Sequence, residues 1–139
     1  IDKYNYTIVM DAAIKLRNVK LRPTKQRILL AKHILDGKNK HFSAETIQKE
    51  VSSYGQSISL ATIYNCLNKF VSVGLLKQIN LQGEVTIFDT NVSQHHHFLN
   101  QNTGELIDID PDEIGFSKLP KIPNGFENNG VEVLIKIKE

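Results

Sequence analysis

Four consecutive segments in the first half of the chain carry apolar residues at the spacing of an α-helix, and short breaks separate them. Thr24, Ser43 and Ser59 stand before the second, third and fourth segments, where a hydroxyl oxygen can cap a helix. Gly55 and Gly74 follow the third and fourth segments and can end them. The pattern predicts helices over about residues 6–18, 25–35, 44–54 and 60–73.

Two strand-like runs follow the last of these helices. Residues 75–89 are rich in aliphatic and β-branched side chains on either side of a Gln82-Gly83 turn, which predicts a β-hairpin. Closely joined helices followed by a hairpin are the order of a winged helix-turn-helix, whose last helix enters the major groove of DNA. Any small α+β domain could give the same order, so the spacing alone leaves the function open.

The rest of the chain is shorter and richer in strand signals. We expect strands over residues 97–100, 105–110 and 131–138, the start of a short helix at 112–116, and a loop at 119–125. Three strands with so little helix cannot bury both faces of a sheet, so we expect a homodimer. The predicted fold is α+β: a winged helix over residues 1–88 and a small α/β dimerisation domain over 89–139.

Charge divides the chain in the same way. Residues 1–84 hold 13 Lys and Arg against 6 Asp and Glu, whereas residues 85–139 hold 4 against 9. The basic half therefore suits a polyanion such as double-stranded DNA, although a basic face that simply meets solvent is the alternative. The 139 residues are 40% hydrophobic and 23% charged, which is ordinary for a globular protein.

Several classes of protein are not expected. No apolar run approaches the ~20 residues that a membrane helix needs, and residues 1–10 do not read as a signal peptide, so we expect a cytoplasmic protein. Cys66 is the single cysteine, which excludes an internal disulfide and a structural zinc held by four cysteines. Any bound metal must rest on histidines and carboxylates.

Three of the five histidines are consecutive, at His95, His96 and His97. On a strand, His95 and His97 would face the same way and could grip one ion, while His96 points to the other face. Asp89 and Asp108 are the nearest oxygen donors, and imidazole with carboxylate suits Fe, Mn or Zn. The alternative is a surface histidine run.

Two further histidines lie in the basic half. His41 precedes the cap Ser43 and could reach the end of the hairpin, whereas His33 reads as structural or solvent-facing. A metalloenzyme with three protein ligands and a water is a second hypothesis. Nothing in the sequence supplies a substrate pocket or a paired general acid and base, so we do not expect an enzyme.

Together these residues resemble the Fur family of metal-dependent transcriptional regulators over nearly the whole chain. The motifs that carry the resemblance are Leu21-Arg22-Pro23-Thr24-Lys25-Gln26-Arg27, His41-Phe42-Ser43-Ala44-Glu45, Leu60-Ala61-Thr62-Ile63-Tyr64 with Leu67-Asn68, and Phe88-Asp89 before the histidine cluster. The resemblance implies a winged helix followed by an α/β dimerisation domain, and a homodimer that binds an inverted-repeat DNA operator.

The resemblance also implies roles for individual residues. It assigns the regulatory metal to His41, Asp89, His95, His97 and, as in the peroxide-sensing branch, Asp108. It makes Tyr64 a base-contacting residue and Arg22 a probe of the minor groove, where a narrow groove attracts cations. The expected DNA contacts are Lys20, Arg22, Lys25, Ser59, Ala61, Thr62, Tyr64 and Asn65, the last standing where many members carry Arg.

The dimerisation domain is similar to that of one subgroup, the haem-sensing iron response regulators (Irr). The family's zinc-binding cysteines are absent, with Asn100 and Thr103 where the first pair would stand. In the Irr subgroup a triple histidine is associated with haem, so His95, His96 and His97 are candidate haem ligands. The resemblance therefore implies a repressor of iron or haem genes, with a Fur-like iron, manganese or zinc co-repressor site without haem as the alternative.

Overall fold

The computed structural model describes residues 3–81 and 85–139, and the chain forms two compact units, Ile1–Val92 and Ser93–Glu139. The sequence placed the domain boundary after residue 88, whereas the units divide after Val92. The reason is that the strand ending at Asp89 pairs with two strands of the first unit.

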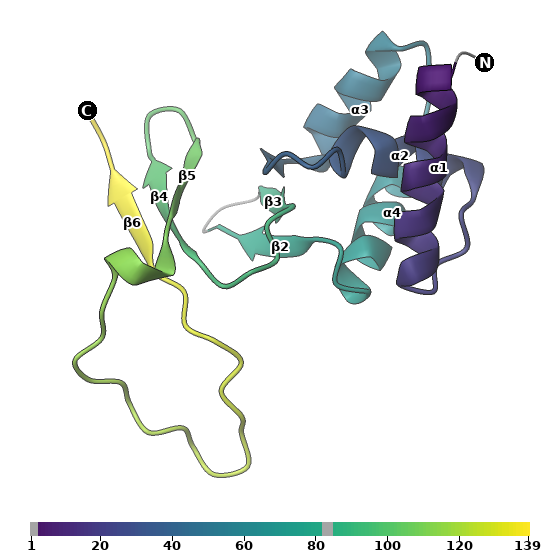
Figure 1. Cartoon of the computed structure of the whole chain (residues 1–139). Helices are drawn as coiled ribbons and strands as arrows, with labels where there is room; N and C mark the ends of the chain where they lie inside the picture. Colours follow the sequence, from purple (N-terminus) through teal and green to yellow (C-terminus); the bar gives the residue numbers. More distant parts are fainter. Residues whose placement is uncertain (1–2, 82–84) are drawn as a thin grey trace. The chain divides into compact units, whose positions relative to one another are not determined.

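Four helices build most of the first unit: α1 (Lys3–Asn18), α2 (Lys25–Ile34), α3 (Ala44–Ser53) and α4 (Leu60–Ser72). The three predicted caps are confirmed, because Thr24, Ser43 and Ser59 each accept a hydrogen bond from a backbone N–H of the following helix. Helix α1 packs against α2, and α3 packs against α4 (Figure 1). None of the described helices is long and apolar enough to cross a bilayer.

The predicted hairpin is confirmed as β2 (Lys77–Asn80) and β3 (Thr86–Asp89), which pair antiparallel. Its Gln82-Gly83 turn lies outside the described residues. A two-residue strand that the sequence did not predict, β1 (His41–Phe42), pairs with the other edge of β3 and completes a three-stranded sheet of order β1-β3-β2. Two residues are too few to show a periodicity, which is why β1 could not be predicted from the sequence.

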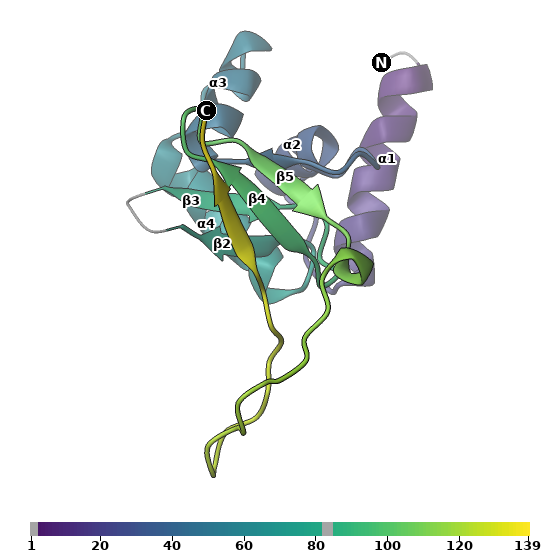
Figure 2. The same cartoon turned by 90° about the vertical axis from the view of Figure 1, so that its left-hand side faces the viewer.

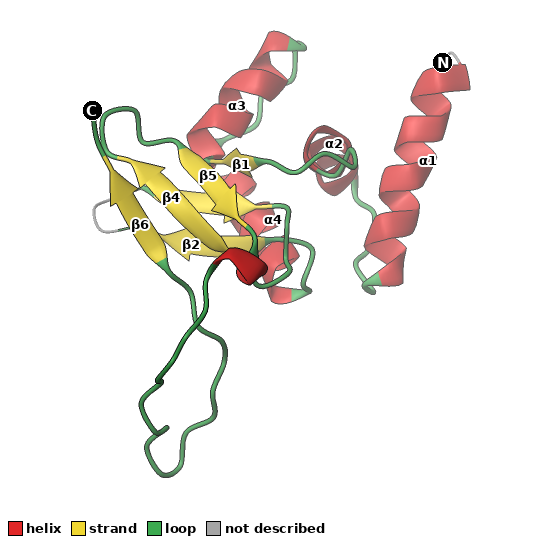
Figure 3. Cartoon of the chain, turned by 60° about the vertical axis from the view of Figure 1, so that its left-hand side comes forward, coloured by secondary structure: helices red, strands yellow, loops and turns green. Residues whose placement is uncertain are grey.

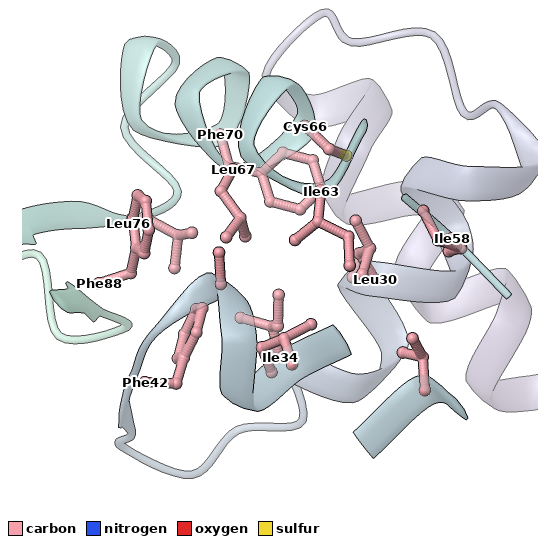
Figure 4. Packing of buried hydrophobic residues seen from close by; sticks show 14 of the residues in the cluster. Leu30, Ile34, Phe42, Ile58, Ile63, Cys66, Leu67, Phe70, Leu76 and Phe88 are labelled. Atoms are coloured by element: carbon pink, nitrogen blue, oxygen red, sulfur yellow. The ribbon is translucent and has the colours of Figure 1, made fainter. Parts of the chain in front are cut away.

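The sheet and the helices of the first unit share one hydrophobic core (Figure 4). Phe42 of β1 and Phe88 of β3 stack with their ring centroids 5.8 Å apart. Ile63, Leu67 and Phe70 on one face of α4 are fully buried in the same core. The core therefore fixes α4 relative to the hairpin, and it leaves the opposite face of α4 to solvent.

The second unit is a three-stranded sheet with a long excursion. Its strands are β4 (His96–Asn100), β5 (Leu106–Ile109) and β6 (Leu134–Ile137), and the central β4 pairs antiparallel with β5 and parallel with β6 (Figure 2). The helix expected from residue 112 is only a 3-10 turn, η1 (Pro111–Glu113). The segment between η1 and β6 contains no further helix or strand and runs far out from the sheet (Figure 3).

Candidate metal centre and DNA-binding face

Two of the five predicted metal ligands lie together in the first unit. The pairing of β1 with β3 sets His41 directly opposite Asp89. The His41 Nε2 atom lies 3.1 Å from the Asp89 Oδ2 atom, and the Asp89 Oδ1 atom accepts a hydrogen bond from the backbone N–H of Asn91. The short strand β1 thus brings an imidazole to a carboxylate that is 48 residues away along the chain.

The other three predicted ligands lie together in the second unit. The pairing of β4 with β5 sets His97 opposite Asp108. The Nε2 atoms of His95 and His97 lie 3.3 and 3.2 Å from the same oxygen, Asp108 Oδ1. The two imidazole rings are 4.5 Å apart and inclined at 62°. Two nitrogens and one carboxylate oxygen therefore converge.

A backbone contact sets the protonation of His95. Its Nδ1 atom lies 2.7 Å from the carbonyl oxygen of Ser93, and because a carbonyl only accepts, Nδ1 carries the proton. In the neutral ring the Nε2 atom then carries a lone pair, which faces the carboxylate of Asp108. This donor set fits a divalent metal of the Fe, Mn or Zn type.

His96 has different surroundings from its two neighbours. Its Nδ1 atom accepts a hydrogen bond of 2.9 Å from the backbone N–H of Val133, which precedes β6. Its ring lies 6.0 Å from the ring of Phe116. In the neutral ring the proton is therefore on Nε2. The described contacts of His96 are structural, and they tie the end of the chain to β4.

The eight predicted DNA contacts all fall in the first unit. Tyr64 and Thr62 lie on α4 and are half-buried, while Ala61 and Asn65 on the same helix and the cap Ser59 are exposed. The basic residues Lys20, Arg22 and Lys25 are exposed in and beside the connection from α1 to α2.

A cavity of about 460 Å³ opens between α2 and α4. Arg27, Lys69, Asn65 and Cys66 are among its lining residues. Burial raises the pKa of the Cys66 thiol to about 11, and the nearby Arg27 offsets this only in part. Cys66 is therefore a neutral thiol at physiological pH, and it is not an activated nucleophile.

Three features close to the predicted DNA contacts were not predicted from the sequence. The Tyr64 hydroxyl donates a 3.0 Å hydrogen bond to the Glu45 carboxylate, and this contact raises the pKa of the Tyr64 phenol. Arg27 donates to the carbonyl of Arg22 at 2.9 Å. Lys20 has a positive φ of 61°. The Arg22–Arg27 contact and the end of α1 at Lys20 are local, whereas the contact of Tyr64 with Glu45 depends on how α3 meets α4.

A family model and individual relatives of known name agree on the family to which the chain is similar. The model of the Ferric uptake regulator family matches residues 18–135. The chain is similar to the Ferric uptake regulation protein of Shigella flexneri, with 31% identity over 105 residues, covering 75% of this chain and 71% of that protein. The protein of the same name from Pseudomonas aeruginosa is 32% identical over 101 residues, covering 72% and 75%.

Solved structures show the same fold. The ferric uptake regulator of Pseudomonas aeruginosa with manganese has a TM-score of 0.71 at 24% identity, covering 92% of this chain and 97% of that one. The Vibrio cholerae ferric uptake regulator has a TM-score of 0.71 at 22% identity, covering 91% and 98%. These likenesses confirm the predicted α+β fold of a winged helix followed by a small α/β domain. The chain belongs to the Ferric uptake regulator family and is a metal-responsive transcriptional regulator, not an enzyme.

Proposed function

We propose that the protein is a homodimeric, cytoplasmic repressor of iron or haem genes whose binding to an inverted-repeat operator is controlled by a divalent metal. The observation that carries this proposal is the convergence of His95 and His97 on one oxygen of Asp108. Two imidazole nitrogens and a carboxylate oxygen that converge in this way are a donor set that suits a divalent metal.

The proposed metal ligands are the five residues named from the sequence. His95, His97 and Asp108 would hold the metal from the second unit, and His41 with Asp89 would contribute from the first. A metal that takes ligands from both units restricts their relative orientation, so it favours the conformers that bind DNA. Solved relatives are described with manganese in Pseudomonas aeruginosa and with iron in Francisella tularensis, which supports either ion.

The proposed DNA contacts combine base reading with phosphate binding. Tyr64 and Asn65 on α4 would read base edges, and Arg22 would enter the minor groove. The other proposed contacts would set the position of α4 on the DNA backbone; they are made by Lys20, Lys25, Ser59, Ala61 and Thr62. Dimerisation through the second unit is supported by its large exposed apolar side chains, among them Ile107, Leu134 and Ile135.

Haem sensing, as in the Irr subgroup, is the second candidate. The triple histidine favours it, and His95, His96 and His97 are its candidate ligands. The contact of His96 weighs against that residue, because a ring whose Nδ1 accepts from Val133 has its proton on Nε2 and offers no lone pair to iron. The 139 residues contain only one cysteine, the buried Cys66, so we propose no structural zinc held by cysteines.

Calorimetric titration of the metal-free full chain with Mn²⁺ tests the metal site. We expect His97→Ala to weaken binding by at least about tenfold, because it removes one of few ligands. His33→Ala is the matched control, since His33 contacts Glu50 and Tyr54 away from the proposed ligands. Equal Mn²⁺ affinity in the wild type and His97→Ala would refute the site, and a haem titration that saturates His96→Ala like the wild type would exclude His96 as a haem ligand.

A further inference from the structure

The hydrogen bond between Tyr64 and Glu45 joins the two helices of the helix-turn-helix. Glu45 lies in the first turn of α3 and Tyr64 on α4, and the hydroxyl and the carboxylate are 3.0 Å apart. An ionised carboxylate can only accept a hydrogen bond, so the Tyr64 hydroxyl must donate its single proton to this bond. What remains on the phenol oxygen is a pair of acceptor sites.

The contact therefore leaves only hydrogen-bond acceptors on the oxygens of Tyr64 and Glu45. The Tyr64 oxygen and the Glu45 carboxylate are both acceptors, and the structure describes no other hydrogen bond for either side chain. DNA phosphates are also acceptors, so they are repelled by the carboxylate and find no donor on the phenol. In the major groove, by contrast, adenine N6 and cytosine N4 present N–H donors.

We infer that Glu45 is a specificity-determining residue that holds Tyr64 as a hydrogen-bond acceptor, so that the Tyr64 oxygen selects adenine or cytosine over thymine or guanine on the contacted strand. The inference rests on the proposed role of Tyr64 in reading bases. Glu45 acts partly as a positioning residue, through the phenol, and partly through its own negative charge, which penalises unspecific contact with the backbone.

The test is a selection from a randomised duplex library with the manganese-loaded full chain, followed by titration of the selected duplex and of a shuffled duplex. Glu45→Ala should lower the ratio of the two affinities by about tenfold, the size of one good base contact. It should also bind the shuffled duplex more tightly, since a negative charge is gone. The base enriched at one position should broaden from adenine or cytosine to all four.

Glu45→Gln is the matched control, because its amide oxygen can still accept from the Tyr64 hydroxyl while the charge is removed. We expect it to keep the affinity ratio to within about threefold of the wild type, as a neutral hydrogen bond replaces a charged one. It should gain affinity for the shuffled duplex as Glu45→Ala does. A ratio that falls equally in both variants would overturn the positioning role.

Tyr64→Phe completes a double-mutant cycle with Glu45→Ala. In that background Glu45→Ala should leave the enriched bases unchanged, because the hydroxyl that Glu45 holds is absent. Independent effects of the two substitutions on base preference would overturn the inference. In the free protein, the phenolate absorbance attributed to Tyr64 by subtracting Tyr64→Phe should titrate at lower pH in Glu45→Ala than in the wild type.

The outcomes separate this inference from the proposed function. If the wild type enriches no sequence, the proposed operator binding fails and the inference falls with it. If the wild type enriches a sequence and Glu45→Ala enriches the same one with an unchanged affinity ratio, only the role of Glu45 is overturned.

Discussion

Backbone contacts determine which ring nitrogen of His95 and of His96 carries the proton. The Ser93 carbonyl places the proton of neutral His95 on Nδ1, whereas the Val133 N–H places the proton of neutral His96 on Nε2. Two neighbouring residues of the same type therefore differ in role: His95 is a proposed metal ligand, and His96 is a structural hydrogen-bond acceptor. Strand alternation predicted this division, but it could not say which ring nitrogen would carry the proton.

Lys20 combines a strained backbone with a proposed DNA contact. The N–H groups of Lys20 and Leu21 bond to the carbonyls of Arg17 and Leu16, so Lys20 occupies the left-handed position of a Schellman motif that ends α1. We expect Lys20→Gly to raise the free energy of unfolding by about 1 kcal/mol, because glycine adopts a positive φ without a Cβ penalty. Urea unfolding measures this change.

The control for Lys20 is Lys20→Ala, which removes the charge and keeps the strain. Both variants should lose the same affinity for a shuffled duplex, since both lose one phosphate-binding cation. Only the glycine variant should gain stability. Equal stability of the two variants would show that the positive φ costs nothing in this motif.

At the scale of elements, the sequence predicted what local rules control. The caps Thr24, Ser43 and Ser59 and the apolar face of α4 were all readable, because capping and helical periodicity depend on near neighbours. Strand β1 and the contact of Glu45 with Tyr64 were not, since both depend on pairing between residues far apart in the chain. Strand alternation and position in the chain singled out His95, His97, Asp89, Asp108 and His41 as candidates, and the resemblance then assigned all five to one site.

The connection of β6 to β4 offers a test of the structural role of His96. His96→Ala leaves the Val133 N–H without its acceptor, and we expect the free energy of unfolding to fall by about 1–3 kcal/mol. Hydrogen exchange should show protection lost at Val133 and along β6, while the Mn²⁺ affinity stays near that of the wild type. A loss of Mn²⁺ affinity as large as in His97→Ala would instead make His96 a ligand.

At the scale of the whole molecule, charge and chemistry are divided between two units. Most basic residues lie before residue 85 with the helix-turn-helix, whereas four of the five proposed ligands lie in the acidic part that follows. Each unit contributes part of the proposed metal site, so metal binding and DNA binding are expected to be thermodynamically linked. Linkage of this kind is what the response of a regulator to metal requires.

The most direct test of this account is the affinity of the full chain for a library-selected duplex, measured with and without Mn²⁺ at fixed salt. We predict that Mn²⁺ tightens binding by about tenfold or more in the wild type and in His33→Ala, but has little effect in His97→Ala. Equal affinity of the wild type with and without Mn²⁺ would show that the metal does not control DNA binding.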